Sequence, residues 1–475
     1  MKGPFEKHTG ITGREAGVII LLFVISRIII RIIGIEMDYQ ALYRNWQYLS
    51  VDTLRHDLLK GVWYDHTQPP LFNLLLGVIL KISGSFAPLA FSLLFKIITL
   101  LNTFLLLRLL KENANHRTIP LLFSLIYLLS PATMLFENEL FYTSLITLLL
   151  LLSCNYLLQY QGSGKPGKLL GFFLPLALIC LTRSMYHLAW LILPWLFILN
   201  RSRKKEYARK VLLMGLVFIT IVSGWYIKNS VIFGSFTTST WGGMNIARNV
   251  FHDAVITDSG QIASIEPFSK ISAYTNFLPP EPAAAFKGLN DRDLLQEMKN
   301  DSFINEKHAG YIEISRQYMQ ASKQQVRDHP GAYLKNVVQS AIIFFAPATR
   351  YPVNEAQARK MKYYDLLYSF NLSHLAEGKQ ERRIALTLSA LPKFIIYLLV
   401  FFVIFRNWIQ KKRITLLHLF IIYVIGYIFC ISSLFEHYEN MRFRYEAEPL
   451  FLILAAGVLS AWINKRSNKK KQAIY

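Results

Sequence analysis

Long apolar stretches dominate the chain, and short polar or basic segments separate them. A helix that crosses a bilayer needs about 20 consecutive, mainly apolar residues. A further apolar region, 169–199, is interrupted by Arg183, Ser184 and His187, which predicts two tilted spans joined by a tight turn. With that pair the pattern predicts an all-α polytopic membrane protein with about ten transmembrane helices. The single spans are expected at about 16–35, 86–110, 119–136, 141–160, 211–228, 386–405, 414–433 and 449–463.

The apolar run 69–82 does not fit this length requirement. It opens with Pro69-Pro70 and reaches only to Ser83-Gly84, so it holds about fourteen apolar positions. Such a run is typical of a re-entrant or interfacial helix. We therefore leave it out of the count of spans.

The basic residues predict the orientation of these spans. Short cytoplasmic loops of membrane proteins carry an excess of Lys and Arg. With 69–82 excluded, every basic cluster falls on one side, which places both termini in the cytoplasm of a multi-pass plasma-membrane protein. No small-residue cleavage site follows the first apolar run, so we expect that run to remain as an anchor. The clusters are Lys111/Arg117, Lys165/Lys168, Arg201 to Lys210, Arg406 to Arg413 and Lys465 to Lys471.

Composition agrees with a membrane protein and excludes other classes. The chain is 53% hydrophobic and 17% charged, and its net charge is +22. A nucleic-acid-binding protein would gather its basic residues on a soluble domain, whereas here they lie between apolar stretches. Cys154, Cys180 and Cys430 all lie in apolar segments, without a C-x-x-C or zinc spacing, and are expected to be core residues.

Three regions follow from this topology. Residues 1–228 form an N-terminal transmembrane module with a first external loop at 36–68. Residues 229–385 form an extracytoplasmic domain of mixed, mainly helical structure. Residues 386–475 form the C-terminal transmembrane helices and a basic cytoplasmic tail. No internal repeat is visible, whereas many secondary transporters are built from repeated halves.

Candidate chemistry begins directly after the first span, in the first external loop. Glu36 and Asp38 stand two residues apart there. Two carboxylates at the membrane surface suit a general base or a divalent cation, and the alternative is a solvated helix end. The same loop ends with His66 and Gln68 among aromatic residues, and these side chains could line a substrate site.

Further charged residues stand at the outer ends of other spans. Glu137 and Glu139 follow Ser130-Pro131, and a Glu near a membrane is costly unless it faces water or a cavity. Arg183, Arg442 and Arg444 lie on the side that the positive-inside rule disfavours for Arg. A guanidinium binds phosphate in a bidentate manner, so these three arginines suit a lipid phosphate. The alternative is a structural pair with nearby Glu.

With these residues in place, the chain resembles GT-C glycosyltransferases of the protein O-mannosyltransferase and lipid A aminoarabinose transferase type. The likeness extends from about residue 16 to 455. It rests on the acidic Glu36-Met37-Asp38, on Gln68-Pro69-Pro70-Leu71 where the family has H-P-P-L, on Trp225 to Gly234 followed by Trp241-Gly242-Gly243-Met244-Asn245, and on Arg442-Phe443-Arg444-Tyr445 with Pro449.

The resemblance implies transfer of a sugar from a polyprenyl-phosphate carrier to a protein, lipid or glycan acceptor, with inversion at the anomeric carbon. It implies that Asp38 is the catalytic base and that Glu36 assists it. It also implies that Lys228, where the family has Arg, joins Arg183, Arg442 and Arg444 around the donor phosphate. The acceptor and sugar site would then hold His66, Gln68, Glu137, Glu139 and Asn229.

Two departures bear on the chemistry. Many family members have adjacent Asp-Glu, whereas Tyr39 follows Asp38 here and the second acid is Glu36. This spacing leaves the divalent cation as an option rather than a requirement. The His of H-P-P-L is Gln68, which predicts a different distribution of contacts to the donor.

Two other functional classes compete with a transferase. A transporter or flippase would use intramembrane acids and arginines as a substrate path, but the chain has no repeats and a large region outside the predicted spans. A non-catalytic scaffold would leave Glu36 and Asp38 without a role. We find no G-x-x-x-x-G-K-[ST] loop for a nucleotide, which a carrier-linked donor does not need.

Overall fold

The computed structural model describes residues 10–114, 116–201, 205–255, 292–300, 303–410 and 415–472. Residues 256–291 of the predicted extracytoplasmic domain lie outside the described residues, as do Arg203 and Lys204, the cluster at 411–413, and side chains beyond Arg466. The described chain is helical apart from one short antiparallel pair, β1 (Met298–Asn300) with β2 (Phe303–Ile304).

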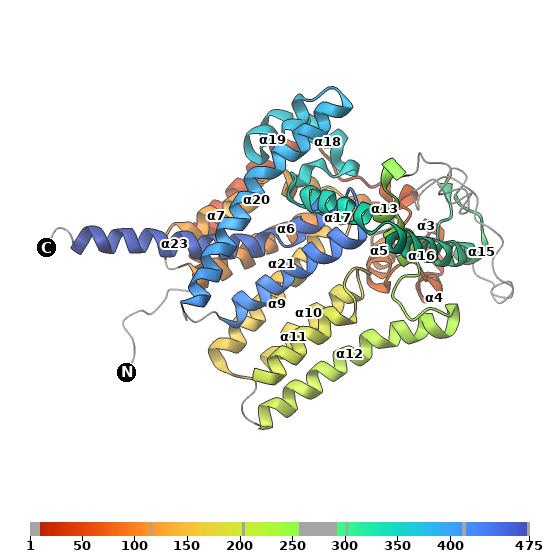
Figure 1. Cartoon of the computed structure of the whole chain (residues 1–475), viewed down its shortest axis with the longest axis horizontal. Helices are drawn as coiled ribbons and strands as arrows, with labels where there is room; N and C mark the ends of the chain where they lie inside the picture. The colour runs from red at the N-terminus through yellow and green to blue at the C-terminus, as the bar shows by residue number, and fades with distance from the viewer. Residues whose placement is uncertain are drawn as a thin grey trace.

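A bundle of long helices makes up most of the molecule (Figure 1). Six helical segments of the described chain are long and apolar enough to cross a bilayer, or seven if the bent pair α7–α8 is one span. The prediction of an all-α membrane protein is therefore confirmed, while the count of ten spans and their orientation stay predictions. The bundle helices are α1 (Gly13–Ile32), α6 (Ala87–Asn113), α7 (Ile119–Leu129), α8 (Pro131–Glu137), α9 (Thr143–Ser163), α10 (Lys168–Cys180), α11 (Leu188–Arg201), α12 (Lys205–Phe233), α20 (Lys379–Ile409), α21 (Leu416–Phe435) and α23 (Glu448–Gln472).

Local sequence explains where several of these helices begin and bend. Thr12 caps α1 in a capping box: its hydroxyl accepts from the Glu15 N–H at 3.3 Å, and the Glu15 carboxylate accepts from the Thr12 N–H at 2.8 Å. Pro131 lacks an N–H and disfavours helix at Ser130, so α7 stops and α8 restarts at an angle of 54°. The apolar region 169–199 forms α10 and α11, and the turn between them holds Arg183.

The run 69–82 forms α5 (Pro70–Ser83), which the 3-10 turn Gly84–Phe86 joins to α6. Figure 1 shows α5 beside α3 (Val51–His56) and α4 (Leu58–Tyr64), at one end of the bundle. Gly77 permits this packing, because a Cβ there would lie 2.3 Å from a methyl carbon of Leu58 and 3.0 Å from the Leu54 carbonyl oxygen.

Helices from distant parts of the chain gather at the same end of the bundle, and we call them the cap (Figure 1). The cap comprises α3, α4, α5, α13 (Gly242–Val255), α15 (Arg292–Leu295) and α16 (Gly310–Asp328). Its own apolar core includes Trp241, Met244, Tyr311 and Ile314. The rings of Trp46 and Trp241 lie 5.0 Å apart, so the first loop packs directly against the start of α13.

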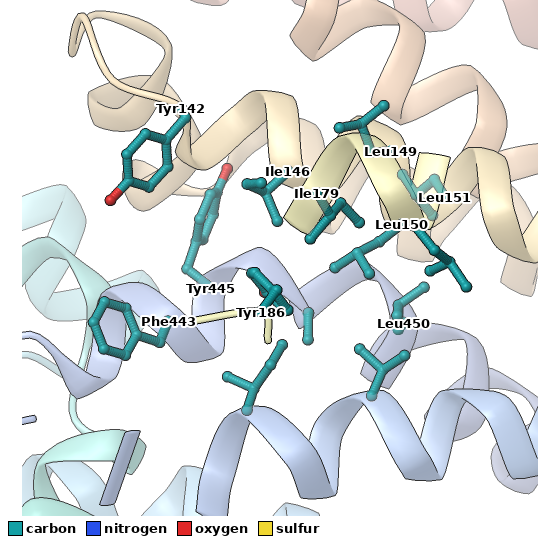
Figure 2. Close-up of a cluster of buried hydrophobic side chains, with 14 of the residues drawn as sticks. Tyr142, Ile146, Leu149, Leu150, Leu151, Ile179, Tyr186, Phe443, Tyr445 and Leu450 are labelled. Atoms are coloured by element: carbon teal, nitrogen blue, oxygen red, sulfur yellow. The ribbon is translucent and has the colours of Figure 1, made fainter. Parts of the chain in front are cut away.

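The main core fills the bundle and reaches the short helix α22 (Asn440–Glu446). Figure 2 shows Leu150 of α9 near Leu450, and Ile146 of α9 near Tyr445 of α22. Cys154 and Cys180 are buried in this core, as expected, whereas Cys430 is exposed on α21. Packing on α9 fixes α22, and α22 in turn carries Arg442 and Arg444.

The segment between the cap and α20 completes the structure. Its helices are α17 (Pro330–Phe345), α18 (Glu355–Lys360) and α19 (Lys362–Ser369), with 3-10 turns at Ala348–Arg350, Pro352–Asn354 and Leu372–Leu375. Helix α17 packs against α20, α21 and α22. This contact closes the side of the bundle next to α22.

Candidate functional site

A polar cavity of about 140 Å³ lies between the cap and the bundle, and we call it the cap cavity. Six segments supply its walls: the first loop, Tyr142 just before α9, the turn between α10 and α11, residues 237–248, the end of α21, and α22 with the residues before it. The charged residues in its wall are Arg183, Arg248, Glu436, Glu439 and Arg442, and its other polar or aromatic lining includes Trp46, Gln47, Gln68, Tyr142, His187, Trp241 and Asn245.

Arg442 is the most distinctive side chain of the cap cavity. It is 2% exposed and forms an ion pair with Glu439 through Nη2. Its Nε and Nη1 atoms are buried and have no hydrogen-bond partner among the described residues. The guanidinium carbon lies 4.6 Å from the Phe141 ring centre and 5.0 Å from that of Tyr351. Buried N–H donors without partners are costly, so a hydrogen-bond acceptor brought to these two atoms would stabilise this arginine.

Backbone geometry helps to place Arg442. Tyr438 has a φ of +78°, which a bulky side chain rarely adopts, and α22 begins two residues later. The Asn440 side chain donates to the Ser432 carbonyl at 2.8 Å and ties this bend to the end of α21. The bend therefore turns α22 back under the cavity, with Arg442 facing it.

Arg183 lines the cap cavity from the turn after α10. It forms an ion pair with Glu446, and its guanidinium carbon lies 3.8 Å from the Phe443 ring centre. The Tyr186 hydroxyl donates to the same Glu446 carboxylate at 2.8 Å. These contacts hold Arg183 rigidly, with its charge balanced from the side away from the cavity.

The sequence reasoning missed Arg248, Glu436 and Glu439 as site residues. Arg248 Nη1 lies 3.0 Å from Glu436 Oε1 and 3.9 Å from Glu439 Oε1. Burial raises the pKa of Glu436 to about 7. Burial also disfavours ionised Glu439, but Arg442 and Arg248 outweigh it and hold the Glu439 pKa below its usual value. The sequence did contain a signal for Glu436 and Glu439, because both lie within six residues of Arg442, which was already a candidate.

Charge at the cap cavity has a consequence for its ligand. Three arginines and two glutamates line the wall, and Glu446 behind the wall balances Arg183, so a positive excess arises when Glu436, whose pKa burial raises to about 7, is protonated. In a site of low dielectric constant such an excess favours a bound anion.

The two acids that follow the first span have separate partners. Asp38 forms an ion pair with Arg44, and its side chain is 18% exposed. Glu36 lies 2.9 Å from Arg31, and both side chains are exposed. Neither acid lines the cap cavity, and in the described ranges no three His, Cys, Asp or Glu residues gather as a metal site would require. The divalent cation stays a prediction.

Glu137 and Glu139 have different environments although two residues separate them. Glu137 is buried in the bundle and paired with Arg27 of α1 at 2.6 Å. Glu139 is 5% exposed, and its Oε2 atom is buried without a partner among the described residues. Burial raises the Glu139 pKa to about 8, with Arg442 and Asp38 among the charges that act on it. Glu139 therefore interacts electrostatically both with Arg442 of the cap cavity and with Asp38 of the first loop.

His66, Lys228 and Asn229 belong to a buried network beneath the cap. The two ring nitrogens of His66 lie 2.7 Å from Thr240 Oγ1 and 2.9 Å from the Lys307 carbonyl oxygen, and burial lowers its pKa to about 4. Lys228 donates to the Trp63 carbonyl at 2.9 Å, and Asn229 donates to the Thr237 carbonyl at 2.7 Å. These contacts support the framework, and none of the three lines the cap cavity.

A buried ion pair completes this network. Lys307 Nζ lies 2.7 Å from Asp65 Oδ2 and joins the first loop to the segment before α16. Gln68, three residues after Asp65, reaches the cap cavity. The network therefore fixes one wall of the cavity.

Arg444 is separated from the other two predicted arginines. Its Nε donates to the Phe344 carbonyl at 2.7 Å, its Nη2 to the Ala346 carbonyl at 3.2 Å, and its Nη1 pairs with Glu448. It lines a second cavity rather than the cap cavity.

No protein-family model, curated protein or solved structure matches this chain.

Proposed function

We propose that this chain is a GT-C-type membrane glycosyltransferase that takes a sugar from a polyprenyl-phosphate carrier, with the cap on the outer face of the plasma membrane. The observation that carries the proposal is Arg442, which is buried, charged and left with two unpartnered donors beside a cavity. A phosphate on a lipid carrier supplies the anion that such a group needs.

The proposed reaction uses this charge in its transition state. A carboxylate removes the proton of the acceptor hydroxyl, whose oxygen attacks the anomeric carbon. The bond from that carbon to the phosphate oxygen breaks, and the carrier phosphate leaves with the electron pair. Arg442, with Arg183 and Arg248, would stabilise the negative charge that develops on it.

The size of the cap cavity suits the polar end of a ligand rather than a whole ligand. Its volume of about 140 Å³ is below the roughly 300–1,000 Å³ of pockets that enclose a whole ligand. A phosphate with part of one sugar is a suitable occupant. The isoprenoid tail would stay outside, in the bilayer.

Two carboxylates are candidates for the base. Asp38 is the choice that the family resemblance implies, and its side chain is partly accessible. Glu436 lines the cap cavity, and its raised pKa of about 7 suits a group that must gain and lose a proton near neutral pH.

Transfer is tested with the purified full-length protein in liposomes that contain a radiolabelled polyprenyl-phosphate sugar and an extract of membrane acceptors. Label should move to an acceptor with wild-type protein and not with Arg442→Ala. Movement of the intact labelled lipid between leaflets, without transfer, would replace the proposal by the alternative of a transporter or flippase. The buried Arg27–Glu137 pair inside the bundle supports this alternative, because transporters use charged residues within the membrane as a substrate path.

A further inference from the structure

A second cavity, of about 170 Å³ and with charged residues in a mainly apolar wall, lies beside α20, and we call it the α20 cavity. Its walls come from α7, α8, α17, α20, α22 and α23, from Ser130, and from residues 347–348 and 368–370. The cap cavity shares none of its lining residues. The proposed transfer reaction gives it no role.

Three charged side chains line the α20 cavity in the described chain: Lys393, Arg444 and Glu448. Glu448 binds both cations, with Lys393 Nζ 3.0 Å from its Oε1 and Arg444 paired with its Oε2. Within the wall, two cations share one carboxylate, which leaves one formal positive charge there; Asp365, the further acid that acts on Lys393, lies outside the wall and is bound by Thr349, Asn371 and His374. Next to a bilayer such an excess is costly unless an anion balances it.

The two cations retain hydrogen-bonding capacity. A guanidinium has five N–H donors and an ammonium has three. Arg444 donates to the Phe344 and Ala346 carbonyls and to Glu448, and it also forms a hydrogen bond with Tyr397, whereas Lys393 donates once, to Glu448. The Lys393 side chain is 32% exposed, so its remaining donors are accessible to a ligand.

The rim of the α20 cavity is apolar and exposed. Ile126 is 38% exposed, Phe370 46% and Ile396 50%, and all three line the cavity. Ile396 belongs to α20, which is one of the helices long and apolar enough to cross a bilayer. A charged interior behind an apolar rim matches a ligand with an anionic head and hydrocarbon chains.

Phe370 adds a second, independent feature. It has a φ of +54°, and it and Tyr438 are the non-glycine residues of the described chain with positive φ. Strained backbone of this kind is concentrated at functional sites. Tyr438 stands next to Glu439 of the cap cavity, and Phe370 stands on the rim of the α20 cavity.

From these observations we infer that the α20 cavity binds the phosphodiester headgroup of an anionic lipid, with Lys393 and Arg444 contacting the phosphate and the lipid chains lying along α20. One phosphodiester carries the single negative charge that the cavity lacks. This inference concerns binding and does not depend on the proposed transfer reaction.

The test uses full-length protein in phosphatidylcholine nanodiscs that contain a minor fraction of phosphatidylglycerol, and native mass spectrometry counts the phosphatidylglycerol retained on the released protein. Lys393→Gln should reduce retention about tenfold, the factor expected for losing a hydrogen bond to a charged group. Glu448→Gln should increase retention, because it raises the excess charge. Lys335→Gln, which removes an exposed lysine of α17 away from the cavity, should leave retention unchanged.

Equal retention by wild type, Lys393→Gln and Glu448→Gln would overturn the inference. Displacement of the lipid by millimolar inorganic phosphate would also overturn it, because a site for free phosphate needs no apolar rim. Thermal melting of each variant in detergent shows whether it is folded, and Glu448→Gln keeps the test decisive if Lys393→Gln is not.

Discussion

At the scale of single residues, Arg442 is the side chain on which the proposed function depends most. Arg442→Ala should lower turnover by about 10²–10³-fold, the usual loss for removing a donor that stabilises transition-state charge. Arg442→Lys should also be harmful, because a lysine ammonium cannot replace the two coplanar donors that Nε and Nη1 of the guanidinium supply. Steady-state kinetics with a labelled donor measure both effects. A fully active Arg442→Lys protein would contradict the bidentate contact.

Asp38 is the second residue-scale prediction. Asp38→Asn keeps the shape of the side chain and removes its basicity, so turnover should fall by roughly 10²–10⁴-fold while donor affinity stays nearly unchanged. Glu36→Gln should be mild, because Glu36 is exposed and paired with Arg31. Chelator treatment of the wild type checks the divalent cation, since a metal-assisted enzyme loses activity and regains it when the cation is restored.

If Asp38→Asn keeps the wild-type rate, the base must lie elsewhere. Glu436→Gln then becomes the decisive variant. Because the pKa of Glu436 is about 7, a reaction that uses it as the base should rise in rate through pH 7 and lose that rise in Glu436→Gln. If Asp38 is the base instead, Glu436→Gln should leave the pH profile of the rate unchanged.

Glu139 predicts a pH dependence of stability. Burial raises the pKa of its carboxyl to about 8 in the folded protein, against 4.5 for an unperturbed glutamate. Between these values the folded state binds a proton that the unfolded state has released, so stability falls as pH rises from about 4.5 to about 8. Glu139→Gln should flatten this decline, at about 1.36 kcal/mol per pKa unit. Thermal melting in detergent at several pH values measures it, and an unchanged slope would show that Glu139 is ionised.

At the scale of elements, the contact of α13 with α16 holds the cap together. A Cβ on Gly243 would lie 1.7 Å from the Ser315 carbonyl oxygen and 2.8 Å from the Met319 nitrogen. Because these are backbone atoms, Gly243→Ala must push the two helices apart, which should cost about 1–3 kcal/mol. The cap cavity should change with it, since Gly242 and Asn245 are in its wall.

Gly224 of α12 provides the matched control. No atom lies within 4 Å of a Cβ placed there, so Gly224→Ala should be neutral or slightly stabilising. Melting temperatures of the two variants in the same detergent compare them. Equal melting temperatures for Gly243→Ala and wild type would mean that α13 and α16 pack less closely.

At the scale of the whole molecule, the predicted orientation has a direct test. Helix α12, which begins at Lys205, runs from one end of the bundle to the cap at the other (Figure 1), and the Asn300 side chain in β1 donates to the Tyr43 carbonyl of the first loop at 3.1 Å. In a protein whose exposed Cys430 is replaced by Ala, Asn300→Cys should react with an impermeant reagent on intact cells. Lys205→Cys should react only after permeabilisation. The reverse pattern would overturn the orientation and place the cap in the cytoplasm.

The sequence predicted the coarse architecture because apolar stretches and prolines act locally. The apolar region 169–199 is broken where Arg183 interrupts it, and 69–82 forms a separate short helix that begins at Pro70. The acids after the first span were harder to interpret. A motif such as Glu36-Met37-Asp38 gives spacing along the chain but not the partners, and here Arg31 and Arg44 take one acid each.

Sequence by itself determined that this is an all-α membrane protein, because the bilayer imposes a length and a polarity on each spanning segment. Only the tertiary structure decided how the charged residues combine. Arg442 and Arg444 are two residues apart, yet they line different cavities because they lie on different sides of α22. Arg442 lines the same cavity as Arg248, which is nearly two hundred residues away in the sequence. Such groupings arise from the packing of α22 on α9 and α17 and of α13 on α16. Contacts between distant segments depend on the whole fold, and no local pattern of residues encodes them.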